Sequence, residues 1–226
     1  MRKMLRRIIR LCHPDGIPGL GALVYNAMSR KDIFQHHYQL VADDIARYYT
    51  AGRMLDVGTG PGWLLLILKR RLPKTEPEGL DISAAMVAQA RRNMQEAGYG
   101  GKINVRIGSV YALPYQDSTF DCVVSTGSMH HWKKMDDAFR EIYRVLKGNG
   151  HALIYDLVQN IPRDVLNSFR KEFGGYRSYL LWLHSFEEPF YDVEEVASIP
   201  ASTPFEIGEI HFTGALCCLV LRKEKV

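Results

Sequence analysis

The feature that most constrains this chain is a strand, a glycine-rich turn and a helix in immediate succession. Residues 54–57 (MLDV) form a short, largely apolar run, which predicts a buried strand. The run GTGPG at 58–62 follows, and glycine suits tight turns and close approach of a ligand to the backbone. Residues 63–72 then read as a helix. The free N–H groups at such a helix start can bind an anionic or polar ligand group.

The alternation of strand and helix continues to about residue 157. Further strands are expected over 78–82, 103–107, 121–125 and 151–157, and helices over 84–97 and 136–146. Ser83 is the expected N-cap of the first of these helices, and Gly98 stands where a helix usually ends. This order predicts the α/β class, with a doubly wound, mostly parallel, Rossmann-like sheet and helices on both faces.

The two ends of the chain depart from this alternation. Residues 22–50 and 162–190 have helical spacing, and the second segment is rich in aromatic residues. The run DVEE at 192–195 predicts a capping box with aspartate as the cap. Residues 205–211 and 215–222 are expected to form an antiparallel strand pair at one sheet edge.

The distribution of charge excludes some partners. Five of the 29 basic residues lie in residues 1–10, so the remaining chain holds 24 basic against 25 acidic residues. Proteins that track nucleic-acid phosphates usually carry a broad basic surface, so nucleic acid is an unlikely partner.

The basic residues of the N-terminal segment alternate with apolar ones at helical spacing over residues 1–11. A short solvated helix packed on the body is favoured slightly over a helix that binds an anionic membrane surface. The sequence leaves the oligomeric state open.

The cysteines indicate a reducing compartment. Cys12, Cys122, Cys217 and Cys218 form no CxxC pair, so the sequence predicts no metal site. Cys217 and Cys218 should point to opposite faces of one strand. Arginines interrupt the N-terminal apolar residues, so no secretory signal is visible and a cytoplasmic location is expected.

Asp81 closes the second predicted strand, 19 residues after Gly62. A carboxylate in this place can accept hydrogen bonds from two neighbouring ribose hydroxyls. The competing interpretation is an N-cap, a role for which Ser83 is also suited. A dinucleotide-binding turn would need glycine at position 63, where Trp63 stands, and this disfavours a nicotinamide-dependent oxidoreductase.

Four runs together resemble the class I, Rossmann-like S-adenosylmethionine-dependent methyltransferases. They are LDVGTGPG (55–62), GLDIS (79–83), FDCVVSTGSMHHW (120–132) and AFREIYRVLKGNGHALIYD (138–156). The last two are similar to the subgroup that methylates small molecules, including the type 11 and quinone-biosynthesis enzymes. The resemblance covers about residues 50–160. It implies S-adenosylmethionine as the cofactor.

The resemblance also implies roles for single residues. The methionine part of the cofactor would be lined by Asp56, Gly58, Thr59, Gly60 and Gly62, the ribose held by Asp81, and the adenine flanked by Ile82, Met86, Ser109 and Val110. Ser125, Thr126 and Gly127 would border the sulfonium and the substrate entrance. Members of the family often have an acid at position 109, so the serine leaves the adenine contact at that position in doubt.

His130 and His131 follow the fourth predicted strand, where the acceptor should approach. Histidine suits proton removal near neutral pH, which makes both candidate catalytic residues. The alternative is that they pack the loop. Asp156, at the end of the fifth strand, is a second candidate near the acceptor. A lid could be formed by Tyr25, Asn26, His36, His37 and Tyr38. The favoured alternative is that the tyrosines pack in the core and that one of the two adjacent histidines faces solvent.

The expected function is in-line methyl transfer to a small-molecule acceptor, which would be lipid-like if the N-terminal segment binds membranes. The alternative is a catalytically inactive, cofactor-binding regulatory or partner protein, for which Ser109 is the hint. We expect one domain over residues 1–226. Its parts are a helical extension or lid (1–50), a cofactor-binding half (51–160), and substrate-side helices with C-terminal strands (161–226).

Overall fold

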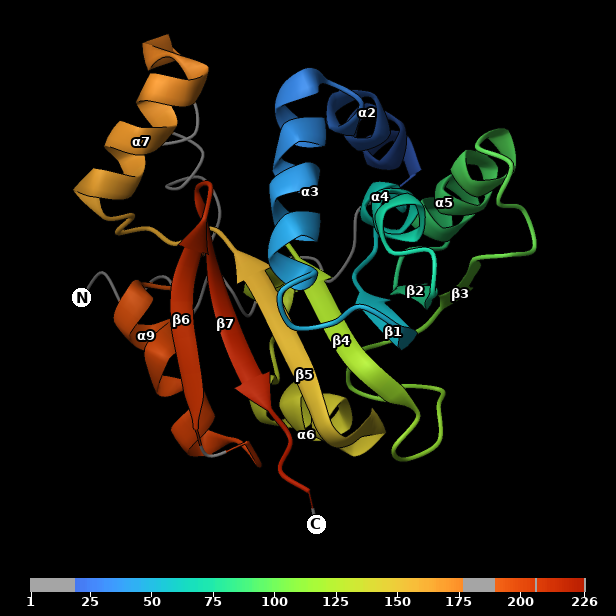
Figure 1. Cartoon of the computed structure of the whole chain (residues 1–226). Coiled ribbons are helices and arrows are strands. Elements are labelled where there is room, and N and C mark those ends of the chain that lie inside the picture. The colour runs from blue at the N-terminus through green and yellow to red at the C-terminus, as the bar shows by residue number, and fades with distance from the viewer. Residues whose placement is uncertain (1–18, 177–189, 206, 226) are drawn as a thin grey trace.

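The computed structural model describes residues 19–176, 190–205 and 207–225. A seven-stranded sheet runs through it in the order β3-β2-β1-β4-β5-β7-β6 (Figure 1). The strands are β1 Gly52–Val57, β2 Thr75–Asp81, β3 Asn104–Ile107, β4 Phe120–Thr126, β5 Leu146–Asp156, β6 Gly208–Thr213 and β7 Leu216–Arg222. The first five are parallel, and β7 pairs antiparallel with both β5 and β6. The predicted fold class and the antiparallel C-terminal pair are thereby confirmed.

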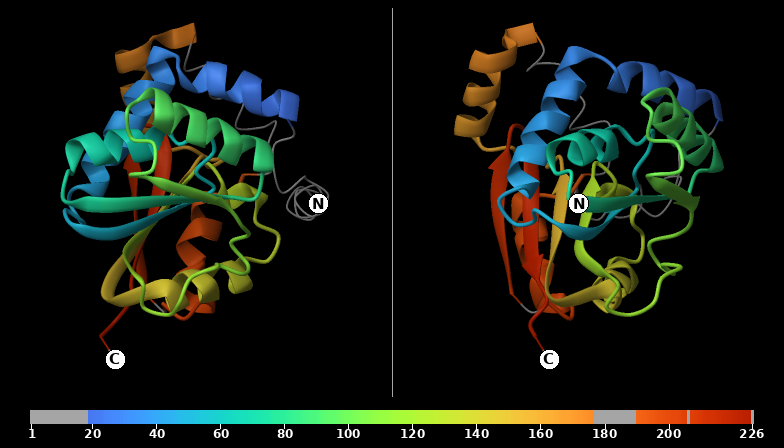
Figure 2. Two further views of the ribbon diagram at one scale, coloured as in Figure 1. Left: turned by 90° about the vertical axis from the view of Figure 1, so that its right-hand side faces the viewer. Right: turned by 45° about the vertical axis from the view of Figure 1, so that its right-hand side comes forward.

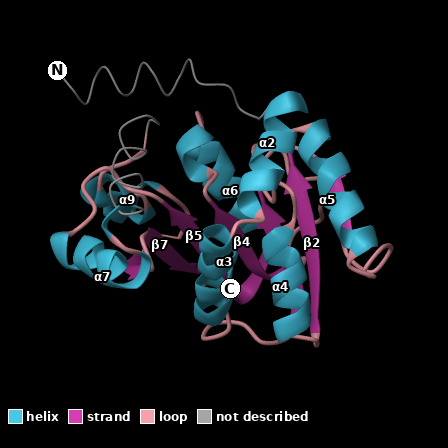
Figure 3. Cartoon of the chain, turned by 90° about the horizontal axis from the view of Figure 1, so that it is seen from above, coloured by secondary structure: helices cyan, strands magenta, loops and turns pink. Residues whose placement is uncertain are grey.

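Helices cover both faces of the sheet (Figure 3). They are α2 Gly19–Ser29, α3 Asp32–Ile45, α4 Trp63–Arg71, α5 Ala84–Glu96, α6 Met135–Val145, α7 Arg163–Phe173 and α9 Val193–Ser198. Alternation along β4 shows how the two cores arise, because Cys122 and Val124 pack with α3, α4 and α5 whereas Val123 packs with α6. Both faces of the parallel strands are therefore buried, as the apolar strand sequences require.

The strand order reverses between β1 and β4. The chain runs outward from β1 to β2 and β3, and then returns to place β4 and β5 on the other side. The connections after β1 and β4 therefore diverge, which leaves a crevice at the carboxyl ends of these strands. The arrows of β4 and β5 in Figure 1 point to this end, where α2, α3 and α7 lie, and Figure 2 shows the same end from two further sides.

The helix ends predicted from capping residues are confirmed by the structure. The Ser83 side chain accepts a hydrogen bond from the Met86 N–H, and Gly98 has the left-handed φ of +78° that favours glycine after a helix. The predicted capping box is confirmed, with Asp192 and Glu195 each bonded to the other's backbone.

Several strand boundaries differ from the prediction, and two of these differences have a clear physical reason. β5 begins at Leu146 instead of 151, because Leu146 already pairs with Phe120 of β4. The KGNG run then forms an irregularity, with Asn149 at a φ of +65°, before His151 pairs with Cys122. β6 begins at Gly208, and Phe205 packs its ring edge-on against Tyr143 and Phe139. Burial of this aromatic ring outweighs its strand propensity.

Residues 1–11, and residues 177–189 of the predicted aromatic helical segment, lie outside the described residues. Within the described ranges, no helix combines the length and the apolar character that crossing a bilayer requires.

Candidate functional site at the carboxyl ends of β1 and β4

A cavity of about 1110 Å³ occupies the crevice where the strand order reverses. Pockets for a single drug-sized ligand usually measure about 300–1,000 Å³. Its lining includes the predicted residues Asp56, Gly58, Thr59, Gly60, Asp81, Ile82, Met86, Ser109, Val110, Thr126, Gly127, His130 and His131. Residues from four separate loops thus meet around one space large enough for a cofactor and a second molecule.

Asp81 links the glycine turn after β1 to the loop after β2. Its carboxylate accepts a hydrogen bond from the Gly60 N–H at 2.8 Å and another, through the other oxygen, from the Ser83 N–H at 2.8 Å. Each carboxylate oxygen can accept a further bond, so the group remains competent to bind ligand hydroxyls. Burial raises the pKa of Asp81, and the two backbone bonds oppose that rise. Ser83 takes the N-cap role, so Asp81 is not needed for it.

Asp56 is the second buried carboxyl group of the cavity. It is 2% exposed and accepts a hydrogen bond from the Thr59 hydroxyl at 2.7 Å. Burial, reinforced by the nearby charge of Asp81 and opposed by the Thr59 bond, raises the pKa of Asp56 from 3.8 to about 7. A cationic ligand group beside this carboxyl would favour its ionised form.

We expect the ligand-free protein to lose stability as the pH rises from about 4 to about 7. The Asp56 carboxyl loses its proton near pH 4 in the unfolded chain but only near pH 7 in the folded one, so ionisation penalises the folded state in this window. At about 1.4 kcal/mol per pKa unit, the full effect is on the order of 4 kcal/mol. Urea unfolding at pH 5 and pH 8 should show a smaller decline for Asp56→Asn than for the wild type. Equal declines would contradict the raised pKa.

The glycine turn after β1 needs glycine for steric and conformational reasons. Gly58 has a φ of +73°, and a Cβ there would collide with the Ser128 side chain. The Ser128 hydroxyl accepts a hydrogen bond from the Trp132 indole N–H at 3.2 Å, which restrains it. The turn therefore packs directly against the loop after β4.

Gly58→Ala is expected to destabilise the protein more than Gly98→Ala. Both glycines have a positive φ, which costs an alanine about 1–2 kcal/mol. No atom lies within 4 Å of a Cβ built at Gly98, whereas the collision at Gly58 should add about 1–3 kcal/mol. Urea denaturation of the two variants measures the difference. Equal losses of stability would show that the loop after β4 can move to accommodate the added Cβ.

The side of the cavity next to β2 and β3 has an apolar edge. Ile82 lines the cavity and is 42% exposed, which is unusual for isoleucine and suits stacking against a flat ring. Ser109 accepts a hydrogen bond from the Tyr111 N–H at 3.2 Å through its hydroxyl oxygen. The hydroxyl proton of Ser109 remains available to donate.

A buried histidine–carboxylate pair lies beside the loop after β4. His130 Nδ1 is 2.9 Å from Asp156 Oδ2, and the same carboxylate oxygen accepts the His130 backbone N–H at 2.9 Å. Both residues are at most 5% exposed and line the cavity. Phe190 packs on the His130 ring at 4.4 Å between centroids, and His131 lies on it at 4.0 Å. With Nδ1 held by the carboxylate, Nε2 is the nitrogen left for a ligand.

The N-terminal helices α2 and α3 cover the cavity at the carboxyl ends of the strands (Figure 1). Asn26 on α2 accepts hydrogen bonds from the Trp63 indole N–H at 3.1 Å and the Asn93 side chain at 3.0 Å, which ties α2 to α4 and α5. Tyr25 and Tyr38 line the cavity. The predicted lid segment thus forms part of the wall in this structure.

The two adjacent histidines of α3 lie in different surroundings. His36 is exposed and pairs with Glu172 at 2.6 Å, whereas His37 lines the cavity, stacked on Phe173. Burial lowers the pKa of His37, which favours its neutral form at physiological pH. The expectation that one of the two would face solvent holds.

Comparison with known proteins identifies the part of the chain that builds this site. Residues 55–154 match a protein family described as a methyltransferase domain. These residues carry a methyltransferase domain. Its class uses S-adenosylmethionine as the cofactor, as the four sequence runs implied.

The individual relatives that this chain matches are also named as methyltransferases. A ubiquinone/menaquinone biosynthesis C-methyltransferase of Geotalea daltonii is 31% identical over 121 residues, which are 53% of this chain and 51% of the relative. A demethylmenaquinone methyltransferase of Thermus thermophilus is 33% identical over 115 residues, 51% of each protein. The chain thus spans about half the length of the curated relatives it matches.

A solved structure extends the similarity to nearly the whole chain. A protein of Methanococcus maripaludis, provisionally assigned as an S-adenosyl-L-methionine-dependent methyltransferase, superposes with a TM-score of 0.75 at 25% identity. The match covers 95% of this chain and 97% of that one. A geranyl diphosphate C-methyltransferase of Streptomyces coelicolor shares the fold at a TM-score of 0.58 and 15% identity, over 82% of this chain and 78% of its own.

The residues of the methyltransferase domain fit the cofactor of its class. The buried Thr126 hydroxyl finds no hydrogen-bond partner among the described residues, and a Cβ at Gly127 would meet no atom within 4 Å. A polar ligand group can use this hydroxyl and approach this backbone. Together with the acceptor capacity of Asp81 and the exposed face of Ile82, the wall offers complementary groups to a ribose, an adenine and a charged chain.

Two predicted cofactor residues lie behind the cavity wall of the methyltransferase domain instead of lining it. A Cβ at Gly62 would lie 2.5 Å from Met94 Cε and 3.2 Å from the Ala90 side chain, so this glycine permits α4 and α5 to pack closely. Ser125 is fully buried in β4. Both support the wall, and the structure gives neither a surface in the cavity.

Several lining residues carry no local sequence signal. They are Ile33 and Phe34 on α3, and Leu216 at the start of β7. The aromatic segment expected among the substrate-side helices contributes Phe169, Tyr176 and Phe190 to the lining. Leu216 reaches the cavity because β7 runs antiparallel, so its first residue lies at the edge where the parallel strands end. Such tertiary placement has no short-range signature.

Proposed function

We propose that this chain transfers the methyl group of S-adenosylmethionine to a small, largely apolar acceptor. The observation that carries the proposal is one cavity lined by both Asp81 and the His130–Asp156 pair. In this proposal residues 51–160 hold the cofactor, and residues after 161 join the N-terminal helices around the acceptor.

The cofactor supplies an electrophilic methyl group on a positively charged sulfonium when it is bound. Asp81 would accept hydrogen bonds from the ribose hydroxyls, and Ile82 would pack on the adenine. Asp56, in its ionised form, would balance the positive charge of the methionine part. The chain's main contribution is then alignment of the two reactants in a site that excludes water.

The apolar lining from α3, α7 and β7 supports an apolar acceptor. Ile33, Phe34, Phe169, Phe190 and Leu216 contribute side chains that bind hydrocarbon or ring surfaces. The names of the relatives in quinone biosynthesis support a lipid-like acceptor with a hydroxylated ring. We therefore propose a hydroxyaromatic acceptor with an apolar substituent.

His130 is the proposed general base. Asp156 would hold the Nδ1 proton and orient the ring, which leaves the Nε2 lone pair to take a proton from an acceptor hydroxyl. The ionised acceptor would then attack the methyl group. His131, on the same turn, is proposed to help shape the acceptor side.

The test is to incubate the purified chain with S-adenosylmethionine and each of a panel of acceptors. The release of S-adenosylhomocysteine is then measured. Hydroxyaromatic compounds with isoprenoid tails should support turnover, whereas small polar amines should not. Asp81→Asn serves as the variant with strongly weakened cofactor binding. Cofactor binding without product from any acceptor would favour the inactive binding protein, and absence of binding would overturn the proposal.

A further inference from the structure

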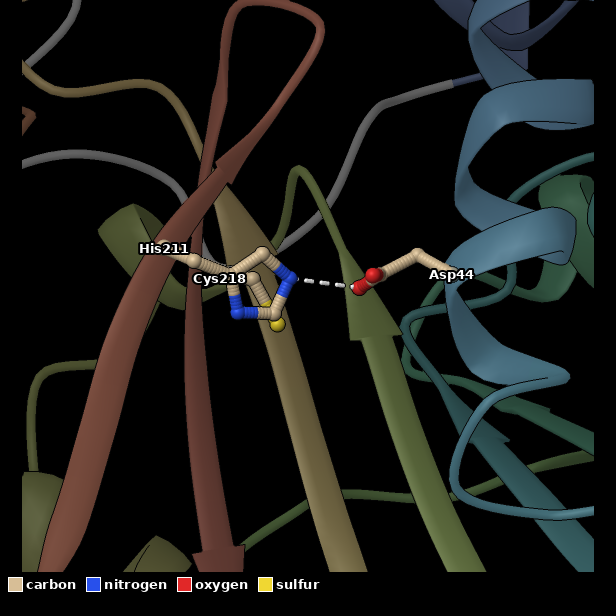
Figure 4. A group of neighbouring side chains, drawn as sticks. All are labelled: Asp44, His211 and Cys218. Atoms are coloured by element: carbon tan, nitrogen blue, oxygen red, sulfur yellow. Dashed lines mark hydrogen bonds and ion pairs between the residues drawn. The ribbon is translucent and has the colours of Figure 1, made fainter.

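Three potential metal ligands meet on the α3 side of the sheet, apart from the residues that line the cavity. They are Asp44 on α3, His211 on β6 and Cys218 on β7, and one ligand atom of each lies within 4.8 Å of the others (Figure 4). His211 Nε2 is 2.7 Å from Asp44 Oδ2. Asp44 and Cys218 are buried, and His211 is partly exposed, which leaves a path for an ion from solvent.

Strand register explains why these residues lie together. His211 and Cys218 are directly paired neighbours on β6 and β7, so their side chains share one face of the sheet. Cys218 belongs to the core that α3 covers, whereas Cys217 belongs to the core on the opposite face. The predicted opposite orientation of the two cysteines is confirmed, and it directs one thiol toward Asp44.

We infer that Asp44, His211 and Cys218 form a binding site for a divalent transition-metal ion of the Zn²⁺ type. A thiolate, an imidazole and a carboxylate suit such an ion, whereas Mg²⁺ and Ca²⁺ prefer oxygen ligands alone. Three side chains from three elements leave a fourth position for water. This proposal departs from the expectation of no metal, which rested on the absence of a CxxC pair.

The surroundings orient the three ligands as the outer shell of a metal site does. The Tyr155 hydroxyl donates to Asp44 Oδ2 at 2.8 Å, and Arg47 donates to Oδ1 at 2.9 Å. The Tyr48 ring lies nearly parallel to the His211 ring, 17° apart at 6.3 Å between centroids. Outer partners of this kind fix ligand geometry and affect metal affinity.

Proton balance is part of the proposal. Cys218 must give up its thiol proton to become a ligand, since the thiolate is the form that binds metal ions. The ion would form a bond to sulfur and displace this proton to solvent, with no change of oxidation state. The same contacts without an ion would be a hydrogen-bonded anchor of α3, and the two cases differ in whether a metal–sulfur bond forms.

Titration of the purified, chelator-treated full chain with Co²⁺ tests the inference. A thiolate-to-cobalt charge-transfer band should appear and saturate near one ion per chain. Cys218→Ser should lose the band, whereas the matched variant Cys217→Ser should keep it. His211→Gln should bind at least tenfold more weakly, and Zn²⁺ should displace Co²⁺. A saturating ion should also raise the Tm by several degrees, since a ligand at about 100 times its Kd stabilises the native state measurably.

The inference is overturned if the wild type gives no thiolate band, or if the band survives in Cys218→Ser. A loss of stability in Cys218→Ser or His211→Gln, without cobalt binding to the wild type, would establish the anchor alone. If Cys218→Ser does not fold, His211→Gln decides, because an unchanged band and affinity in that variant would exclude His211 as a ligand. Neither readout depends on methyl transfer, so failure here is separable from failure of the proposed function.

Discussion

Asp81→Asn is expected to weaken S-adenosylmethionine binding by two orders of magnitude or more. The amide keeps the size of the carboxylate but replaces one acceptor oxygen with an NH₂ donor. In the wild type, both oxygens face backbone donors, the Gly60 and Ser83 N–H groups, so the amide must turn a donor toward one of them. Hydrogen bonds to a charged group contribute about 1.5–3 kcal/mol each, and loss of two to the ribose corresponds to about 3 kcal/mol or more.

Isothermal titration calorimetry with the cofactor measures this effect. Asp137→Asn is the matched control, because Asp137 is an exposed acid in the first turn of α6 and lies outside the cavity lining. Its Kd should equal that of the wild type. Thermal unfolding of both variants checks that they are folded at the temperature of the titration. A Kd for Asp81→Asn within threefold of the wild type would remove Asp81 from the cofactor site.

His130→Gln is expected to lower kcat by about 10²–10⁴-fold, the usual contribution of a general base. The glutamine fills similar space and can still donate to Asp156, but it has no basic nitrogen for the acceptor proton. The Kd for S-adenosylmethionine should stay within twofold of the wild type, because the proposal places His130 on the acceptor side. Steady-state kinetics with a hydroxyaromatic acceptor, together with calorimetry, separates these two readouts.

His151→Gln is the control for this substitution. His151 lies in the middle of β5, five residues before Asp156, and outside the cavity lining, so kcat should be unchanged. His131→Gln should lower kcat less than His130→Gln does, because the proposal assigns the proton transfer to His130. An acceptor that needs no proton removal would leave kcat of His130→Gln near the wild-type value and would contradict the base role.

Sequence patterns were informative where the controlling interactions are local. Alternation of strand and helix identified the sheet, and the caps at Ser83 and Asp192 depend on residues three positions away. Asp81 and the glycine turn could be paired in advance because parallel strands end at one edge. The start of β5 at Leu146 was not predicted, because Gly148 and Gly150 indicated a turn before the strand. The residue that pairs with Leu146, Phe120, lies 26 residues away in the sequence.

The rest of the site arises from tertiary packing. Gly62 belongs to the glycine motif but faces α5, which depends on the angle between two helices and not on the motif itself. Leu216 joins the cavity through the direction of β7, and Ile33 through the position of α3 over the sheet. The cluster of Asp44, His211 and Cys218 spans 174 residues of sequence and needs both the strand register and the helix position.

The order of the strands separates two kinds of evolutionary change. Asp56 and Asp81 lie at the carboxyl ends of β1 and β2, whereas Leu216 sits across β4 and β5 from them, next to the β6–β7 hairpin turn at Gly214. Lengthening or altering that hairpin would reshape the acceptor side without disturbing the turn that holds Gly58. Descendants of such a chain could therefore acquire new acceptors while inheriting the same methyl donor unchanged.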